Sequence, residues 1–270
     1  MRNSATVDLS RPRSVFISDV HLGFRGCHAE ALCQFLRTVK PEYLFLVGDI
    51  IDLWSLKKTF FWPSTHTDAL RAMLCKSREG TKVIYIPGNH DSLFRELAGS
   101  VFGNLEIHHE YNHTTANGKR FLVLHGDVFD SVVKCHPALV HLGTWLYDWL
   151  MWVNPWVNKV RGFFGLANFS LATALKGATG HARRYMQRFE EAAAESARRH
   201  GVDGIICGHI HHAGVREING VTYANDGDWV EHCSSLVEDA SGELRVVRWE
   251  ELLLDQVPLA QVEPIIARAA

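Results

Sequence analysis

The chain has 270 residues, of which 47% are hydrophobic and 21% are charged, and its formal net charge is −2. These values fit a folded protein with a sizeable core and exclude bulk disorder. The near-neutral charge provides no basic field for nucleic acid, so we expect no nucleic-acid partner.

The six cysteines are scattered and form no CxxC pair, which indicates free thiols in a reducing compartment. Residues 1–14 are polar and lack the apolar region of a signal peptide, and no window of 18 residues is apolar and free of charge. We therefore predict a cytoplasmic protein without a membrane-spanning helix, and the sequence leaves its oligomeric state open.

Five apolar runs, rich in β-branched and aromatic residues, predict buried strands. They lie at 14–19, 43–49, 82–91, 120–127 and 204–212. Helical patterns at 27–39 and 66–79 separate the first three runs. Turn signals at Asn117-Gly118, Asn219-Gly220 and Ser241-Gly242 predict three hairpins. This alternation of strands and helices predicts a layered α/β fold.

Residues 131–200 interrupt the alternation with a Trp-rich, helical stretch, far longer than an ordinary connection. We therefore assign 1–130 and 201–270 to the core and 131–200 to a helical cap insertion. Leu142, Trp145, Trp149 and Trp152 fall on one helical face of this insertion. The stripe either packs on the body of the protein or meets lipid, at a membrane surface or around an acyl chain.

Polar residues that can bind a cation follow each of the five predicted strands. Because ligands gather beyond the carboxyl ends of the strands in α/β folds, we expect these side chains to converge. The candidate ligands are Asp19, His21, Asp49, Asn89, His125, His209 and His211. Burying so many carboxylates and imidazoles without a metal would cost several kcal/mol for each unpaired group, which argues against a purely structural role.

Seven nitrogen and oxygen donors exceed the needs of one tetrahedral zinc ion, and they fit two divalent ions that share a carboxylate. A mixture of carboxylate, amide and imidazole suits manganese, iron or zinc better than copper(I). Two ions about 3.5–4 Å apart activate water and neutralise the charge of a phosphoryl group. The sequence therefore predicts a dinuclear centre for phosphoryl chemistry.

Five ordered motifs resemble those of the calcineurin-like metallophosphoesterases: D-x-H at 19–21, GD-x-x-D at 48–52, GNHD at 88–91, HGD at 125–127 and GH-x-H at 208–211. The resemblance implies a β-sandwich flanked by helices, in a four-layer αββα order. It also implies which residues would hold each ion. One ion would bind Asp19, His21, Asp49 and His211, and the other would bind Asp49, Asn89, His125 and His209.

The same resemblance assigns roles beside the metal. His90 would face the substrate and protonate or stabilise the leaving oxygen, and Asp52 would orient His90. Asp91 and Asp127 are more typical of turn and capping groups than of catalysts.

The insertion before GH-x-H and the stretch NDGDWVEHCSSLV at 225–237 are similar to the UDP-2,3-diacylglucosamine hydrolases of lipid A synthesis. That resemblance implies cleavage of the pyrophosphate bond of a nucleotide-linked lipid, giving UMP and a lipid phosphate. It further implies that manganese is the favoured metal and that the protein acts as a peripheral protein at the cytoplasmic face of the membrane. We expect substrate contacts from Asn89, Asp130, Arg183 and Arg184.

His90 departs from that subfamily pattern, in which an Arg stands at this position. A phosphate leaving group has a pKa of about 6 and departs without a proton, whereas an alkoxide gains from a general acid such as His. A phosphodiester or phosphomonoester, lipid-linked or soluble, therefore stays an alternative substrate. A non-catalytic scaffold of the same fold is the other alternative.

Overall fold

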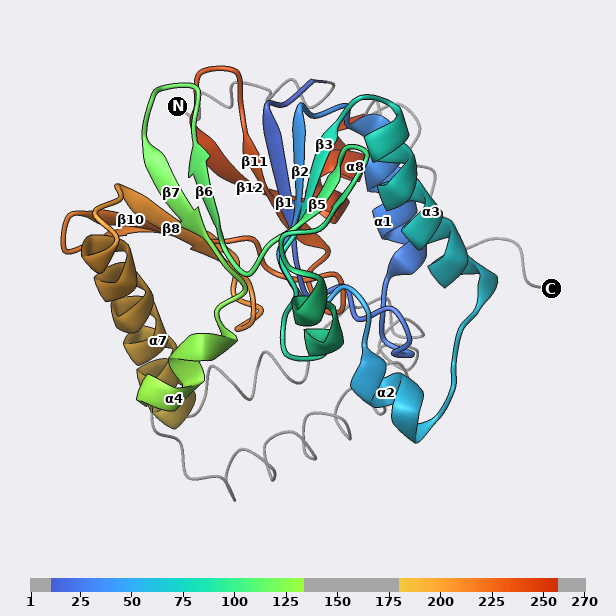
Figure 1. Cartoon of the computed structure of the whole chain (residues 1–270), viewed down its shortest axis with the longest axis horizontal. Coiled ribbons are helices and arrows are strands. Elements are labelled where there is room, and N and C mark those ends of the chain that lie inside the picture. Colours follow the sequence, from blue (N-terminus) through green and yellow to red (C-terminus); the bar gives the residue numbers. More distant parts are fainter. Residues whose placement is uncertain (1–10, 134–179, 257–270) are drawn as a thin grey trace.

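The computed structural model describes residues 11–133 and 180–256, and it contains two β-sheets that face each other (Figure 1). The first sheet has the spatial order β12 (Leu244–Arg248), β11 (Ser234–Glu238), β1 (Ser14–Ile17), β2 (Tyr43–Leu46), β3 (Lys82–Tyr85), β5 (Leu105–Ile107) and β4 (Val101–Phe102). The second sheet has the order β6 (Tyr111–Thr114), β7 (Arg120–Val123), β8 (Gly204–Cys207), β10 (Val221–Asn225) and β9 (Gly214–Ile218).

Helices cover both outer faces of the pair of sheets. Helices α1 (Ala29–Thr38) and α3 (Ser64–Arg78) pack on the first sheet, and α7 (Gly180–Arg199) packs on the second (Figure 1). The shorter helices are α2 (Leu53–Lys58), η1 (Ser92–Leu97), η2 (Asp127–Phe129), α4 (Asp130–Val133) and α8 (Trp249–Gln256). The predicted α/β fold, with two sheets between helical layers, is confirmed.

Strand β1 shows why the sheets are buried on both faces. Phe16 points between the sheets and stacks on Phe45 with ring centroids 4.6 Å apart. Its neighbours Val15 and Ile17 point the other way, into the cluster formed with α1 and α3. Side chains alternate between the faces of a strand, and each fully buried aliphatic or aromatic side chain contributes about 1.5–3 kcal/mol.

The five predicted strands are confirmed, and each ends before its candidate ligands. Strands β1, β2 and β3 are parallel in the first sheet, and β7 and β8 are parallel in the second. β1 ends at Ile17 and β2 at Leu46, so Asp19 and Asp49 lie in loops at the same edge. The Nδ1 atom of His125, after β7, donates to the carbonyl of Val47, after β2, at 2.8 Å. This bond joins the carboxyl edges of the two sheets.

The three predicted hairpins are confirmed: β6 pairs with β7, β9 with β10 and β11 with β12, all antiparallel. Gly118, Gly220 and Gly242 take positive φ values of 84°, 79° and 84°, which glycine adopts without steric cost. No helix among the residues described here has the length and apolar character needed to cross a membrane.

The predicted insertion is described only at its ends, because residues 134–179, with the aromatic stripe, lie outside the described residues. Its first residues form most of α4, and its last residues include all of α7. Phe189 and Ala193 of α7 are buried against Ile205 and Tyr223 of the second sheet. The division into core and insertion therefore stays a prediction, with α7 packed directly on the core.

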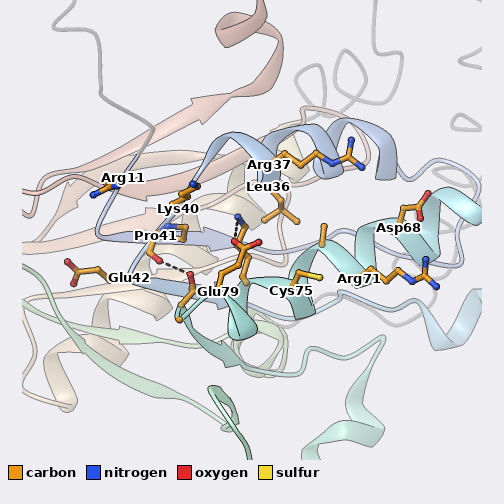
Figure 2. Close-up of a pocket in the computed structure, with 14 residues that line it drawn as sticks. Arg11, Leu36, Arg37, Lys40, Pro41, Glu42, Asp68, Arg71, Cys75 and Glu79 are labelled. Carbon is orange, nitrogen blue, oxygen red and sulfur yellow. Dashed lines mark hydrogen bonds and ion pairs between the residues drawn. The ribbon is translucent and has the colours of Figure 1, made fainter.

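A groove of about 1000 Å³ lies between α1 and α3 on the outer face (Figure 2). Its cations include Arg37 and Lys76, in the last turns of the two helices, where positive side chains complement the helix dipole. Lys76 Nζ donates to the carbonyl of Val39 at 2.9 Å and to Glu79 at 3.1 Å. None of the seven candidate ligands lines this groove, so it is separate from the predicted chemistry.

Candidate metal centre

The candidate ligands stand in loops with unusual backbone geometry. Seven non-glycine residues of the described chain have positive φ, and five of them are candidate ligands. These five are Asp19, His21, Asp49, His209 and His211, with φ between 49° and 69°. Such a conformation costs on the order of 1–3 kcal/mol at each residue and persists where the surroundings enforce it. The strain therefore marks this edge as a site built for binding.

Asp49 lies at the centre of the cluster and is 2% exposed. Its Oδ1 accepts the backbone N–H of His90 at 2.8 Å. Its Oδ2 lies 3.3 Å from Nε2 of His125, 3.9 Å from Nε2 of His21 and 4.0 Å from Nε2 of His90. One oxygen is thus fixed by the backbone, and the other faces three imidazoles, as a carboxylate shared between two ions would require.

Two glycines make room for these side chains. A Cβ on Gly48 would lie 2.3 Å from Nδ1 of His125, and a Cβ on Gly88 would lie 2.2 Å from Oδ1 of Asp49. Neither position tolerates any other residue without displacing a candidate ligand. The glycines of the GD and GN motifs are therefore required by the close approach of the ligands.

Hydrogen bonds behind the rings select the nitrogen that each histidine presents. His125 Nδ1 donates to Val47, so Nε2, a buried atom without a hydrogen bond, is the nitrogen that the neutral ring would offer to a metal. His21 Nδ1 lies 3.3 Å from Oδ2 of Asp52, so its Nε2 faces Oδ1 of Asp19 at 3.8 Å. An outer partner of this kind fixes the tautomer and the orientation of a metal-binding imidazole.

Asp19 is held in the same manner. Its Oδ2 accepts the hydroxyl of Ser18 at 2.5 Å and the backbone N–H of His209 at 2.8 Å. Its Oδ1 is buried without a hydrogen bond and lies 3.1 Å from Nε2 of His211. Oδ1 is therefore the oxygen left to bind a cation.

The described residues form three groups whose ligand atoms lie within 4.8 Å of one another. The groups are Asp19, His21 and His211; His21, Asp49 and His90; and Asp49, His125 and His209. The Oδ1 atom of Asn89, the seventh candidate, is also buried without a partner. A buried polar atom left unpaired costs about 1–3 kcal/mol, and a divalent cation would remove that cost for several atoms at once. The residues present therefore fit a metal centre.

The charges of the cluster favour a cation. Burial opposes ionisation of Asp19, but His211 and His21 hold the pKa of its carboxyl well below the usual value. Burial also opposes the charged form of His125, but Asp49 raises the pKa of that imidazole to about 10. The carboxylates are thus ionised and draw protons onto the imidazoles, and a divalent cation would compete for the same positions.

His90 stands beside the cluster and is held from two sides. Its Nδ1 lies 3.0 Å from Oδ1 of Asp52, which also caps α2 by accepting the N–H of Ser55 at 2.7 Å. The ring of Trp54 lies against the imidazole with centroids 4.2 Å apart. The structure brings His90 and Asp52 together as expected, and their catalytic roles stay predictions. Trp54 was not singled out by the sequence analysis.

Asp91 joins two of the ligand loops. Its carboxylate accepts the N–H of Gly88 at 2.6 Å, the N–H of Ile50 at 2.8 Å and the hydroxyl of Tyr85 at 2.6 Å. Burial, followed by the charge of Asp49, raises the pKa of Asp91. Asp91 thus fixes the loop after β2 to the loop after β3.

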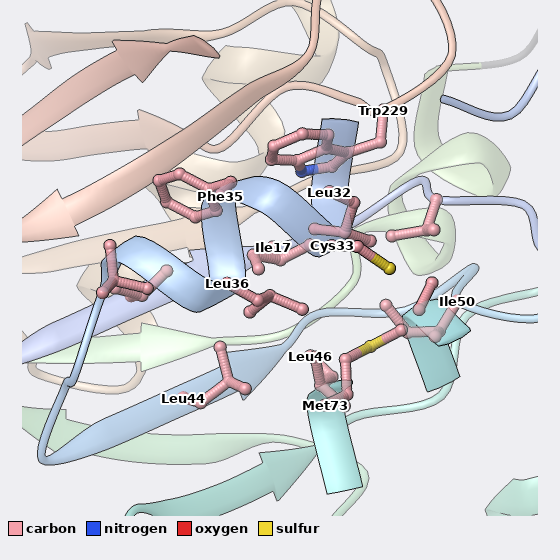
Figure 3. Packing of buried hydrophobic residues seen from close by; sticks show 14 of the residues in the cluster. Ile17, Leu32, Cys33, Phe35, Leu36, Leu44, Leu46, Ile50, Met73 and Trp229 are labelled. Atoms are coloured by element: carbon pink, nitrogen blue, oxygen red, sulfur yellow. The ribbon is translucent and has the colours of Figure 1, made fainter. Parts of the chain in front are cut away.

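A further loop, at 225–233, supports Asp19 and was not predicted to do so. Asp226 is fully buried, and its Oδ1 lies 2.7 Å from the hydroxyl oxygen of Ser18. Burial raises the pKa of Asp226 well above the usual value, so its carboxyl can donate to Ser18 while Ser18 donates to Asp19. The N–H of Trp229 donates to the carbonyl of Asp19 at 3.1 Å, and its indole packs on Phe35 of α1 (Figure 3). The polar run NDGD at 225–228, directly after a predicted strand, is the signal that points to this loop.

The expected substrate contacts occupy different places. Asp130, at the start of α4, accepts a hydrogen bond from Nε2 of His209 at 2.9 Å. Arg183 and Arg184 lie at exposed positions of α7. Asn89 belongs to the cluster itself. Contact of these four residues with a substrate stays a prediction.

Comparisons with known proteins agree with this geometry. The model of the calcineurin-like phosphoesterase family matches residues 12–213, which include all seven candidate ligands. UDP-2,3-diacylglucosamine hydrolase of Haemophilus influenzae (strain PittGG) is 26% identical over 243 residues, covering 87% of this chain and 98% of that protein. The enzyme of that name from Stenotrophomonas maltophilia (strain K279a) is 27% identical over 243 residues, covering 85% and 96%.

Among solved structures, an archaeal phosphodiesterase overlays with a TM-score of 0.42 at 13% identity, covering 87% of this chain and 98% of that one. The family model spans most of the chain, and the ordered motifs inside it meet at one edge of the two sheets. This chain therefore belongs to the calcineurin-like phosphoesterase family.

Proposed function

We propose that this protein is a dinuclear metal hydrolase that cleaves the pyrophosphate bond of a UDP-2,3-diacylglucosamine-like lipid, releasing UMP and a lipid phosphate. The observation that best supports metal-dependent hydrolysis is the position of Asp49. Its Oδ2 faces Nε2 of three histidines at distances of 3.3–4.0 Å. The choice of substrate is supported by relatives named for it, because this chain covers 96–98% of the length of two of them.

The proposed centre would hold two ions, with Asp49 available to both. One would be held by Asp19, His21, Asp49 and His211, and the other by Asp49, Asn89, His125 and His209. Manganese is the expected metal, with iron and zinc as alternatives, because the donors are oxygen and imidazole nitrogen without a thiolate. When bound, the two ions activate water and neutralise the charge on the phosphoryl group.

In this proposal, His90 binds the leaving phosphate group of the substrate. Asp52 engages Nδ1 of His90, so Nε2 is the nitrogen directed toward Asp49, 4.0 Å away. From there it would donate to an oxygen of the departing phosphate and stabilise its charge. Asp52 keeps the imidazole in this orientation, and Trp54 limits its rotation.

Apolar side chains at the same edge support a lipid substrate. Trp54 of α2, Leu93 of η1 and Val128 of η2 are 49%, 55% and 56% exposed, and each element directly follows a ligand loop. We propose that the acyl chains bind over this surface and the insertion, with the protein peripheral at the cytoplasmic face of the membrane. Arg183 and Arg184 would then contact phosphate groups of the substrate.

His90 favours a second candidate function, hydrolysis of a phosphoester with an alkoxide leaving group. An alkoxide is far more basic than a phosphate and benefits from a positioned acid, which typically contributes 10²–10⁴-fold. The contact between His90 and Asp52 provides such a positioned imidazole.

The two candidates are separated by a substrate panel with added MnCl₂. The protein and its His90→Arg and His90→Asn variants are assayed on UDP-2,3-diacylglucosamine in detergent micelles and on bis-p-nitrophenyl phosphate. The proposed function predicts that the wild-type protein turns over the UDP-lipid. It also predicts that the His90→Arg variant keeps most of this activity. Full activity on the small ester with none on the UDP-lipid would exclude the first candidate. A protein that binds no metal and turns over neither substrate would be a scaffold.

A further inference from the structure

The ring of His209 contacts residues from α4 and α7, which lie at the two ends of the predicted insertion. Asp130, the first residue of α4, lies with Oδ2 2.9 Å from Nε2 of His209. Phe189 of α7 stacks on the imidazole with centroids 6.0 Å apart and an interplanar angle of 29°. The rings of Phe129 and Phe189 meet edge to face at 5.5 Å.

Asp130 is itself held by α7, because the hydroxyl of Tyr185 donates to its Oδ1 at 2.6 Å. The carboxylate therefore bridges a tyrosine from one helix and a histidine from the ligand loop after β8. Each carboxylate oxygen of Asp130 thus accepts one hydrogen bond, Oδ1 from Tyr185 and Oδ2 from His209.

This arrangement determines which nitrogen of His209 can bind a metal. When Nε2–H donates to Asp130, the lone pair of the neutral ring lies on Nδ1. His209 groups with Asp49 and His125, and the rings of the two histidines lie 5.1 Å apart. The backbone of His209 is fixed separately, by its N–H bond to Oδ2 of Asp19. Asp130 therefore controls the freedom that remains, which is the tautomer and the rotation of the ring.

We infer that Asp130 is a positioning residue for His209, and that the hydrogen bond from Tyr185 to Asp130 couples the packing of α4 and α7 to metal affinity. The inference rests on the proposed function, since it takes His209 as a ligand. A carboxylate behind a metal-binding histidine fixes the ring and raises its basicity, and its loss typically costs 10–100-fold in metal affinity. Coupling of this kind is reciprocal, so metal at His209 also favours the docked arrangement of the two helices.

The test is calorimetric titration of the metal-stripped, full-length protein with MnCl₂. The variants are Asp130→Asn, Tyr185→Phe and the double variant, and the control is Asp68→Asn, an exposed position on α3. We expect two ions per wild-type chain. Asp130→Asn should weaken one of the two sites by about 10–100-fold and leave the other unchanged. Tyr185→Phe should weaken the same site by about two- to tenfold, the effect of one hydrogen bond.

The double variant tests whether Tyr185 acts through Asp130. If it does, Asp130→Asn and the double variant weaken the site equally, because the tyrosine no longer has its acceptor. Independent, multiplying effects would overturn the coupling. In the metal-free protein, imidazole ¹⁵N shifts should show His209 protonated at Nε2, and a mixture of tautomers in Asp130→Asn.

The rival role of Asp130, direct contact with the substrate, gives a different result. An Asp130→Asn variant that binds both manganese ions as tightly as the wild type, with a raised KM, would overturn the inference and leave the proposed function intact. A wild-type protein that binds no manganese would instead overturn the proposed function, and the inference with it.

Discussion

Strand β1 carries a buried polar cluster at each end, and the two clusters are built differently. At the amino end, Glu238 accepts from the Ser14 hydroxyl at 2.5 Å and from Arg13 Nη1 at 2.8 Å, and it lies 2.7 Å from His113 Nε2. At the carboxyl end, Asp19 lies among histidines. Glu238 and Asp19 are both fully buried.

The amino-end cluster satisfies its own polar atoms, whereas the carboxyl-end cluster does not. Both oxygens of Glu238 have partners, and its residues keep ordinary backbone conformations. At the other end, Oδ1 of Asp19 and Nε2 of His125 make no hydrogen bond and face His211 and Asp49 at 3.1 and 3.3 Å, and five ligand residues have positive φ. Burial of charge is thus common to both ends, while polar atoms without hydrogen bonds and strained backbone distinguish a binding site from a structural network.

Replacing Asp49 by Asn should have the largest effect. Asn keeps the size of the side chain but removes the charge that two ions would share, which is worth several kcal/mol in the transition state. We expect turnover to fall about a thousandfold or more, with loss of bound manganese measured by metal analysis. In the presence of a chelator, the free energy of unfolding should also fall, because burial opposes the charge of Asp49 but His125 and His21 hold its pKa below the usual value. Retention of two ions would contradict the shared role of Asp49.

At the amino end, Glu238→Ala should lower the free energy of unfolding without changing catalysis. It leaves Arg13, Ser14 and the N–H of Ala116 without their acceptor, and breaking such a buried network costs about 3–5 kcal/mol. The free energy of unfolding should fall by this amount, while turnover per folded molecule stays unchanged. Glu243→Ala, at an exposed ion pair on the same hairpin, is the control and should cost less than about 1 kcal/mol. Equal costs for the two variants would show that the network is not stabilising.

The same glutamate predicts how stability depends on pH. Burial would raise its pKa, but hydrogen bonds from His113, Ser14 and Arg13 lower the pKa of Glu238 to about 2, from 4.5 for an unperturbed side chain. The unfolded chain therefore binds this proton first as pH falls, and the stabilisation present above pH 4.5 is lost between about 4.5 and 2. The difference in unfolding free energy between wild type and Glu238→Gln should narrow by about 2 kcal/mol from pH 5 to pH 3. A constant difference over that range would contradict the assignment.

The strands and the candidate ligands were predictable because their signals are local. An apolar run that ends in Asp, Asn or His specifies both a buried strand and the loop after it, as at Asp19 and Asp49. Parallel pairing then brings those loops to one edge, whatever the details of packing. The motifs were also needed, since nothing local separates His125, with its unpartnered Nε2, from His113, which is satisfied by Glu238.

Apart from Asp52, most of the groups that hold the ligands were not predictable, because they come from distant parts of the chain. Asp226 reaches Ser18 across 208 residues, and Tyr185 reaches Asp130 across 55. Trp54 lies on a six-residue helix that is too short to show an amphipathic pattern. Such contacts depend on how the sheets and helices pack, and the periodicity of the sequence does not predict them.

A substitution of Trp54 should have the smallest effect. It tests how strongly the carboxyl-end cluster fixes the orientation of His90. The Trp54 indole is 49% exposed and lies 4.2 Å from the imidazole of His90 with an interplanar angle of 31°. Trp54→Ala would leave the Asp52 hydrogen bond in place and remove the aromatic contact, worth about 0.5–1.5 kcal/mol.

We expect kcat to fall about two- to tenfold, with manganese affinity and unfolding free energy unchanged. Leu74→Ala, at a similarly exposed apolar position on α3, should leave kcat unchanged. If Trp54→Ala instead raised KM for the UDP-lipid at constant kcat, the indole would be part of the lipid-binding surface and Asp52 alone would orient His90. If Trp54→Ala instead lowered the free energy of unfolding as much as Glu238→Ala, Trp54 would have a structural role like that of the Glu238 cluster. The contrast between the two ends of β1 would then not include Trp54.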